Sequence, residues 1–259
     1  GSKFLNSMLL KNKDGYFFDH AVNTTVLAVL VGRKYMFSKN ELLELALGTF
    51  LHDFGKIVVE QIKKSGTNED VRQLEREHPT FGYLIINKSR AASPIVSQII
   101  NQHHEHEDGS GYPMGLMGEN LPPVGTVRRN AKGVIYRLAE ICAVVNAYDN
   151  LVMNPTSNKS WTPAEAIKQL VVDAGTKYNR HVVGTLTKVI TYYPVGTFVR
   201  INNIIDPTLI GYRGVVAKNN EDNLNRPVII LLYNKHNKKI KPRVIDTSRL
   251  NQVELELLV

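Results

Sequence analysis

Two adjacent histidines, His103 and His104, lie in the stretch HHEHEDGSGYP, directly before a glycine–tyrosine–proline turn. A second pair, His52 and Asp53, follows an apolar segment. Adjacent residues at a helix end point about 100° apart, so such a pair can place its nitrogen on one metal ion while its carboxylate bridges to a second. Nitrogen and carboxylate ligands without thiolate suit iron, manganese, zinc or nickel better than calcium or magnesium. These pairs therefore predict a transition-metal site.

Five of the eight histidines are expected at the ends of secondary-structure elements: His20, His52, His78, His103 and His104. A single histidine on a helix is usually a hydrogen-bonded structural residue, and that interpretation fits any one of these taken alone. The two pairs favour the metal-binding interpretation for the group.

The elements that must position these residues begin with helices. Capping boxes or N-terminal prolines mark helix starts at Ser38, Ser93 and Thr162, and the first of these helices leads into His52. Apolar spacing predicts further helices near residues 19–33, 79–88, 134–153 and 179–191.

After Pro194 the pattern changes to short β-branched runs, TFVRI, GVVAK and VIILLY, separated by turn residues. This pattern is typical of a small antiparallel sheet or barrel. We therefore expect a mainly α protein, with a helical metal-binding domain over residues 1–193 and a small β domain over residues 194–259.

The net charge of +8 is distributed unevenly. Residues 1–193 carry 22 Lys and Arg against 18 Asp and Glu, whereas residues 194–259 carry 10 against 6. A basic β domain could meet nucleic acid, an acidic partner or anionic lipid. We favour a solvated basic surface and expect no nucleic-acid partner.

Apolar runs and cysteine content exclude two further classes. No run of about 18 apolar residues is present, so no membrane span is expected. The single cysteine, Cys142, cannot form an internal disulfide, which fits a reducing compartment, and we expect a cytoplasmic protein with Cys142 in the core.

Several motifs together resemble the HD-GYP domain, a branch of the HD metal-dependent phosphohydrolases. They are FFDHAVNTT around His20, HDFGK (52–56), EHPTFG (77–82), HHEHEDGSGYP (103–113) and AEICAVVNAYDNL (139–151), in the family's order. The resemblance covers roughly residues 14–193. The ending YPVGTFVRIN…RPVIILLY is similar to a tail that follows some members.

The resemblance implies a helical bundle that holds two or three metal ions, often iron or manganese, and hydrolyses the bacterial second messenger cyclic di-GMP. It implies a first metal held by His20, His52 and Asp53, with Asp53 bridging to a second held by His78, His103 and His104. Lys56 would contact a substrate phosphate. Asp108 and the turn containing Tyr112 would shape the rim, where substrate and a GGDEF-type partner protein are expected.

The chain departs from the family pattern at three places. Asn146 stands where the family carries an aspartate ligand; its amide oxygen can coordinate but is a weaker donor, and Asp149 is an alternative ligand. Tyr16 stands where members with three metals carry a carboxylate, so two ions are expected, with zinc or nickel as alternatives to iron or manganese. The family's basic segment after Leu151 is replaced, which leaves Lys159 as the expected substrate contact there.

Residues 124–137 look like an insertion between the turn and the last motif helix. Its basic residues could help to bind phosphates, but we expect them to face water: Arg128, Arg129 and Lys132.

Two functions stay open at this point. The first is a phosphodiesterase that converts cyclic di-GMP to pGpG or GMP with a hydroxide activated between two metal ions, Asp53 and Lys56 acting at the catalytic centre. The alternative is a degenerate module that binds nucleotide or a partner protein with little turnover. Asn146 separates them, because it decides how well the first metal is held.

Overall fold

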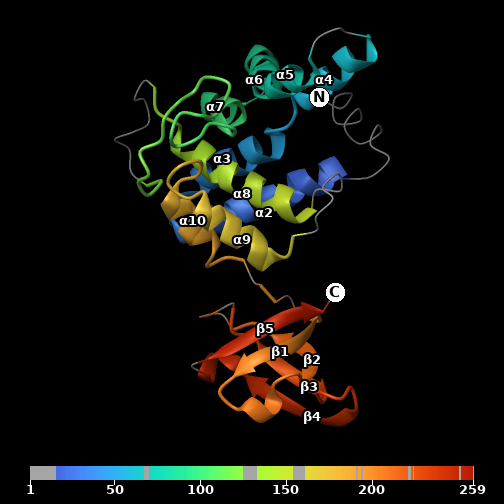
Figure 1. Ribbon diagram of the computed structural model, residues 1–259. Helices are drawn as coiled ribbons and strands as arrows, with labels where there is room; N and C mark the ends of the chain where they lie inside the picture. The colour runs from blue at the N-terminus through green and yellow to red at the C-terminus, as the bar shows by residue number, and fades with distance from the viewer. Residues whose placement is uncertain are drawn as a thin grey trace. The chain divides into compact units, whose positions relative to one another are not determined.

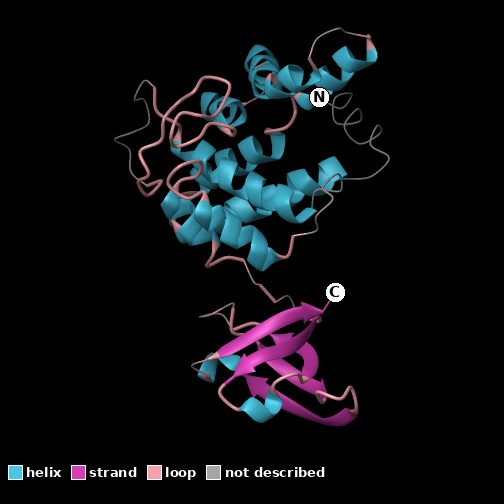
Figure 2. Ribbon diagram, in the orientation of Figure 1, coloured by secondary structure: helices cyan, strands magenta, loops and turns pink. Residues whose placement is uncertain are grey.

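The computed structural model describes residues 16–66, 70–90, 92–124, 133–153, 161–190, 192–193, 195–220, 223, 225–250 and 252–258. Contacts divide the chain into two units, Gly1–Leu186 and Thr187–Val259. The first is helical and the second is a β sheet (Figures 1 and 2). The mainly α fold with a C-terminal antiparallel sheet is as predicted; the predicted boundary at residue 193 stays a prediction, and the division by contacts falls earlier.

The helical unit is built around one buried helix, α8 (Arg137–Met153). Helices α2, α3, α7, α9 and α10 all contact it, and it lies among them in Figure 1. Their bounds are α2 (Tyr16–Lys34), α3 (Lys39–Leu51), α7 (Pro94–Gln102), α9 (Pro163–Val172) and α10 (Arg180–Leu186). Cys142 is buried in α8, as expected.

The described residues of this unit also form α4 (Lys56–Lys64), α5 (Val71–Arg76) and α6 (His78–Ser89). The capping boxes at Ser38 and Thr162 and the Ser93 cap all form and start α3, α9 and α7, as predicted. Helix α8 begins at Arg137 rather than near residue 134, because the backbone on either side of Val134 pairs with Met117 instead. Helix α10 ends at Leu186, earlier than predicted.

One glycine allows the close approach that the site needs. A Cβ on Gly55, in the turn between α3 and α4, would overlap the carbonyl oxygen of His78 and lie 2.6 Å from the backbone nitrogen of Gly82. Only glycine lets this turn touch α6 directly. Near this contact, Asp53 Oδ1 lies 3.2 Å from His78 Nε2.

The second unit is a five-stranded antiparallel sheet in the order β4-β3-β2-β1-β5. Its strands are β1 (Phe198–Ile204), β2 (Arg213–Lys218), β3 (Val228–Tyr233), β4 (Lys239–Asp246) and β5 (Val253–Leu258), with 3₁₀ turns η1 (Pro207–Leu209) and η2 (Thr247–Arg249). Alternate residues of the strands fill one apolar core, which includes Val199, Ile201, Val216, Ile229 and Leu231. Among the described residues, no helix combines the length and apolar character needed to cross a membrane.

Candidate metal centre

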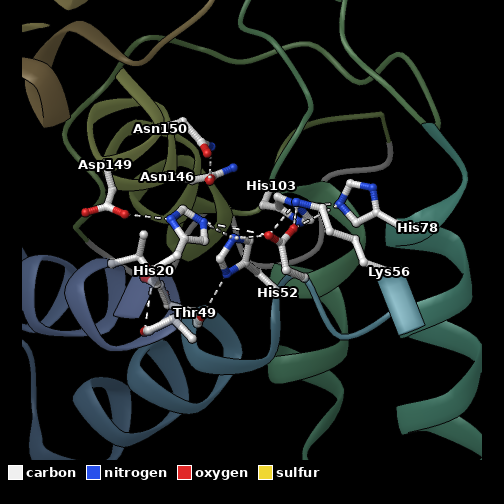
Figure 3. A network of polar contacts seen from close by, with 12 residues as sticks. His20, Thr49, His52, Lys56, His78, His103, Asn146, Asp149 and Asn150 are labelled. Atoms are coloured by element: carbon white, nitrogen blue, oxygen red, sulfur yellow. Dashed lines mark hydrogen bonds and ion pairs between the residues drawn. The ribbon is translucent and has the colours of Figure 1, made fainter. Parts of the chain in front are cut away.

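Asp53 lies between two groups of histidines, and each of its carboxylate oxygens faces one group. Oδ2 lies 3.7 Å from His20 Nε2 and 3.6 Å from His52 Nε2. Oδ1 lies 3.2 Å from His78 Nε2 and 3.8 Å from His103 Nε2. Figure 3 shows the imidazoles of His20, His52, His78 and His103 lying close together.

Two compact donor sets result, and Asp53 belongs to both. One consists of His20, His52 and Asp53, and the other of Asp53, His78, His103 and His104; within each set the donor atoms lie within 4.8 Å of one another. The sequence-predicted histidines and Asp53 are thus brought together, although they come from the ends of different helices.

The second ring nitrogen of each buried histidine fixes its tautomer. Nδ1 of His52 donates to the carbonyl oxygen of Thr49 (2.6 Å), and Nδ1 of His103 donates to that of Ile100 (2.7 Å). Nδ1 of His78 donates in the same way to the carbonyl oxygen of Glu75 (2.6 Å). A carbonyl oxygen can only accept, so the proton of each neutral ring is on Nδ1 and Nε2 carries a lone pair.

Helix α8 orients the imidazole of His20. His20 Nδ1 donates a hydrogen bond to Asp149 Oδ2 at 2.6 Å. Asp149 therefore contacts the ring nitrogen that faces away from Asp53, and acts as a partner that orients His20. A carboxylate on the outer nitrogen of a metal-binding imidazole is a common supporting contact in metal sites.

In the neutral form of these rings, the Nε2 atoms carry no proton and face one another. His20 Nε2 and His52 Nε2 are 3.2 Å apart, and so are His78 Nε2 and His103 Nε2. Asp53 Oδ1 is buried and accepts no hydrogen bond from the described residues. Converging lone pairs and an uncompensated carboxylate oxygen repel one another unless a cation lies among them, so these residues fit transition-metal ions.

Burial lowers the pKa of three of the imidazoles, which favours their neutral form and therefore coordination. It lowers the pKa of His52 to about 4, against the opposing charge of Asp53. Burial, followed by neighbouring imidazoles, holds the pKa of His103 and of His104 well below the ordinary value. For Asp53, burial raises the pKa, but the positive charge of Lys56, with contributions from the neighbouring His52 and His78, outweighs it and holds the pKa well below its ordinary value. Asp53 is therefore the anionic member of both sets.

Lys56, predicted to contact a substrate phosphate, lies at the centre. Its ammonium group donates to Asp53 Oδ2 at 2.5 Å and is partly exposed. An ammonium has three donors, so the others can point to a ligand while this one holds the carboxylate.

The turn after His104 folds back against the ligand loop. Gly111 packs so tightly on the backbone of residues 104–106 that a Cβ would overlap it, and the amide of Tyr112 donates to the carbonyl oxygen of His104 (3.1 Å). The Tyr112 ring stacks on the His104 imidazole at 4.6 Å, and Arg76 lies over the same ring at 4.4 Å. Tyr112 thus lies beside the second donor set, and Asp108, whose Oδ1 accepts from the Ser110 amide, belongs to the same loop.

Asn146 is buried on α8 near the donor sets, and its Oδ1 accepts from Asn150 Nδ2 at 2.7 Å. Figure 3 shows the two amides facing each other. Its predicted role as a ligand stays a prediction. The side chain of Tyr16 lies outside the described residues, and so do Arg128, Arg129, Lys132 and Lys159.

A model of the HD domain family matches residues 5–182. The chain belongs to the HD domain family. It is 29% identical over 254 residues to a cyclic di-GMP phosphodiesterase of Pseudomonas aeruginosa, which covers 96% of this chain and 56% of that protein. It is 25% identical over 191 residues to the cyclic di-GMP phosphodiesterase PdeB of Borreliella burgdorferi, which covers 73% of this chain and 46% of that protein.

The HD domain fold also has a solved counterpart. The structure of Bd1817, an HDG"Y"P protein from Bdellovibrio bacteriovorus, matches with a TM-score of 0.51 and 25% identity, covering 72% of this chain and 56% of that one. With the family match, this confirms the predicted HD-GYP resemblance. The chain spans about half the length of the curated relatives it matches.

Proposed function

We propose that the chain hydrolyses cyclic di-GMP to pGpG or GMP with two transition-metal ions, iron or manganese in preference to zinc or nickel. The observation that carries the proposal is the carboxylate of Asp53, which presents one oxygen to each of two sets of imidazole nitrogens. The names of the curated relatives support the choice of substrate.

The residues of the chain have separate tasks in this reaction. His20 and His52 would hold one ion and His78, His103 and His104 the other, with Asp53 shared between them. Bound ions of this kind supply Lewis acidity and a nucleophile at neutral pH. Lys56 contributes a positive charge beside the carboxylate, which favours the negative charge that develops on phosphoryl oxygens.

Removing the shared carboxylate tests the proposal. We expect Asp53→Asn to lose most bound metal, by elemental analysis, and at least about 100-fold in cyclic di-GMP turnover, by separation of the products. Asp70→Asn is the matched control, because Asp70 caps α5 with its side chain and asparagine caps equally well. An Asp53→Asn protein with two ions and full turnover would refute the proposal.

The degenerate-receptor alternative rests on Asn146. Its amide oxygen is neutral and already accepts from Asn150, so it offers less to a first metal than an aspartate would. Tight cyclic di-GMP binding without turnover, in protein loaded with two equivalents of manganese, would establish this second function in place of the first.

We also propose that a GGDEF-type protein binds at the loop that contains the glycine–tyrosine–proline turn. We propose the cytoplasm, where the proposed substrate acts, as the compartment. Met114, Met117 and Leu121 of this loop expose large apolar side chains, which supports a protein contact. Met117→Asp should weaken binding to an isolated GGDEF domain in calorimetric titration, and unchanged affinity would remove this partner site.

A further inference from the structure

A pocket of about 520 Å³ adjoins the metal centre, and its lining includes His103 and His104. This volume lies within the range of about 300–1,000 Å³ typical of small-ligand sites. The same pocket is lined by Trp161, Asp173, Lys177 and Tyr178, none of which the proposed hydrolysis uses. A ligand whose phosphate lies at the metal centre would therefore place another part of itself against these four residues.

Asp173 and Lys177 present an acceptor and a donor side by side. Lys177 Nζ lies 3.2 Å from Asp173 Oδ1, and Gln169 Nε2 donates to Asp173 Oδ2 at 3.0 Å. A carboxylate accepts about four hydrogen bonds and an ammonium donates three, so both groups keep capacity for a ligand. The two neighbours hold the carboxylate in one orientation.

Backbone hydrogen bonds fix this pair relative to the metal ligands. The amide of Glu107 donates to the carbonyl oxygen of Lys177 (3.2 Å), and the amide of Asp108 to that of Thr176 (2.9 Å). Gly175, with φ +89°, makes the turn that these contacts require, and its amide donates to the carbonyl oxygen of Tyr178 (2.7 Å). The turn over residues 173–178 and the loop carrying His103 and His104 are thus joined directly.

We propose that Asp173 and Lys177 recognise the guanine base of a cyclic dinucleotide; this rests on the proposed function. Guanine presents two adjacent donors, N1–H and N2–H₂, next to the acceptor O6. A carboxylate matches the donors and an ammonium matches O6. Adenine presents the acceptor N1 beside a donor, which sets a lone pair against the Asp173 carboxylate. Trp161 and Tyr178 supply aromatic surface for stacking of the base.

The base preference is the readout that tests this assignment. Affinities for cyclic di-GMP and cyclic di-AMP are measured by calorimetry on the full manganese-loaded chain, together with kcat/KM for both. We expect the unaltered protein to prefer guanine, and Asp173→Asn to reduce the ratio of the two affinities by roughly tenfold to a hundredfold, as expected for loss of a hydrogen bond to a charged group.

Two further variants separate recognition from structure. Lys177→Met, at a half-exposed side chain, should also reduce the ratio, whereas Asp206→Asn makes the same chemical change at a residue that does not line this pocket and should not. If the role of Asp173 were purely structural, Asp173→Asn would weaken the binding of both nucleotides equally. A ratio that stays the same in both pocket variants, or no preference in the unaltered protein, overturns the inference.

The proposed hydrolysis can be refuted independently of the proposed base recognition. Hydrolysis of bis(p-nitrophenyl) phosphate by the unaltered protein tests the metal centre without any base. If neither this compound nor cyclic di-GMP is hydrolysed, while guanine preference remains and depends on Asp173, hydrolysis is refuted and base recognition stands. If turnover is found and the variants keep the same base preference, hydrolysis stands and base recognition by Asp173 and Lys177 is refuted.

Discussion

The imidazoles of His52, His78 and His103 are oriented in the same way, with Nδ1 bonded to the carbonyl oxygen three residues earlier. His20 reaches the same state through Asp149 instead. Because the outer nitrogen is committed as a donor, the inner one is left as a ligand atom of fixed direction. The preorganisation of the site therefore comes from hydrogen bonds that do not involve the metal.

Charge at position 146 should decide how tightly the first ion is held. Asn146→Asp adds one negative charge on α8, and the attraction between a unit negative charge and a dication separated by about 4 Å is worth ~2 kcal/mol even in water. We expect affinity for the weaker of two manganese ions to rise by roughly tenfold or more in calorimetric titration. Asn203→Asp, exposed on β1, makes the same charge change and should have no effect. Equal affinities in all three proteins would contradict the charge argument.

Acid should destabilise the metal-free protein. The ordinary pKa of His52 is 6.5 and its folded pKa is about 4, so between these values the unfolded chain binds a proton that the folded chain does not. The free energy of unfolding therefore falls as pH falls from 6.5 towards 4, and the lowered pKa values of His103 and His104 act in the same direction. The urea midpoint, measured with chelator, should be lower at pH 4.5 than at pH 6.5, and His103→Gln should make the dependence shallower. A dependence as steep in His103→Gln as in the unaltered protein would be evidence against this account.

Three helix starts were predictable from their caps, whereas two short helices were not predicted. Ser38, Ser93 and Thr162 signal their helices directly in the sequence. Helix α4 begins after Gly55 with no side-chain cap and α5 has only six residues, so neither carries enough local signal. The candidate metal ligands could be named from the sequence because each lies in a short motif, and the structure brings these motifs together. Asp149 and His20 are 129 positions apart, and only tertiary packing brings them into contact.

Added volume at the contact between α4 and α6 should lower the free energy of unfolding. Gly55→Ala places a Cβ against the backbone of His78, so we expect a loss of about 1–3 kcal/mol or more in the free energy of unfolding, together with weaker metal binding. Gly184→Ala in α10 meets open space and should raise stability by about 0.5–1 kcal/mol. Urea denaturation of both variants measures the difference. A Gly55→Ala protein as stable as Gly184→Ala would show that this backbone approach is not required.

At the scale of the whole molecule, each unit has its own core, and Tyr193 belongs to that of the sheet. Its ring packs against the apolar cluster of the β unit, and its hydroxyl donates to the carbonyl oxygen of Leu255 at 2.9 Å. The predicted boundary at 193 would leave this residue on the helical side. Composition alone could not reveal this, because the contact joins positions 62 residues apart.

Two fragments compare the boundaries. A chain over residues 187–259 should fold and melt cooperatively, whereas one over residues 194–259 lacks the Tyr193 contact and should lose about 1–2 kcal/mol. For a domain of this size, that loss lowers the melting temperature by roughly 4–8 °C per kcal/mol, which circular dichroism can follow. Equal melting temperatures would restore the boundary at 193.

The carbonyl oxygens that hold His52, His78 and His103 lie in the last turns of α3, α5 and α7. Helix C-termini leave carbonyl groups without intrahelical partners, so the same imidazoles that would coordinate metal under the proposed function also close these helix ends. Fraying of a final turn then releases a ligand, and capture of an ion suppresses the fraying. By linkage the two effects are equal in free energy. Metal binding should therefore slow amide hydrogen exchange at three separate helix ends.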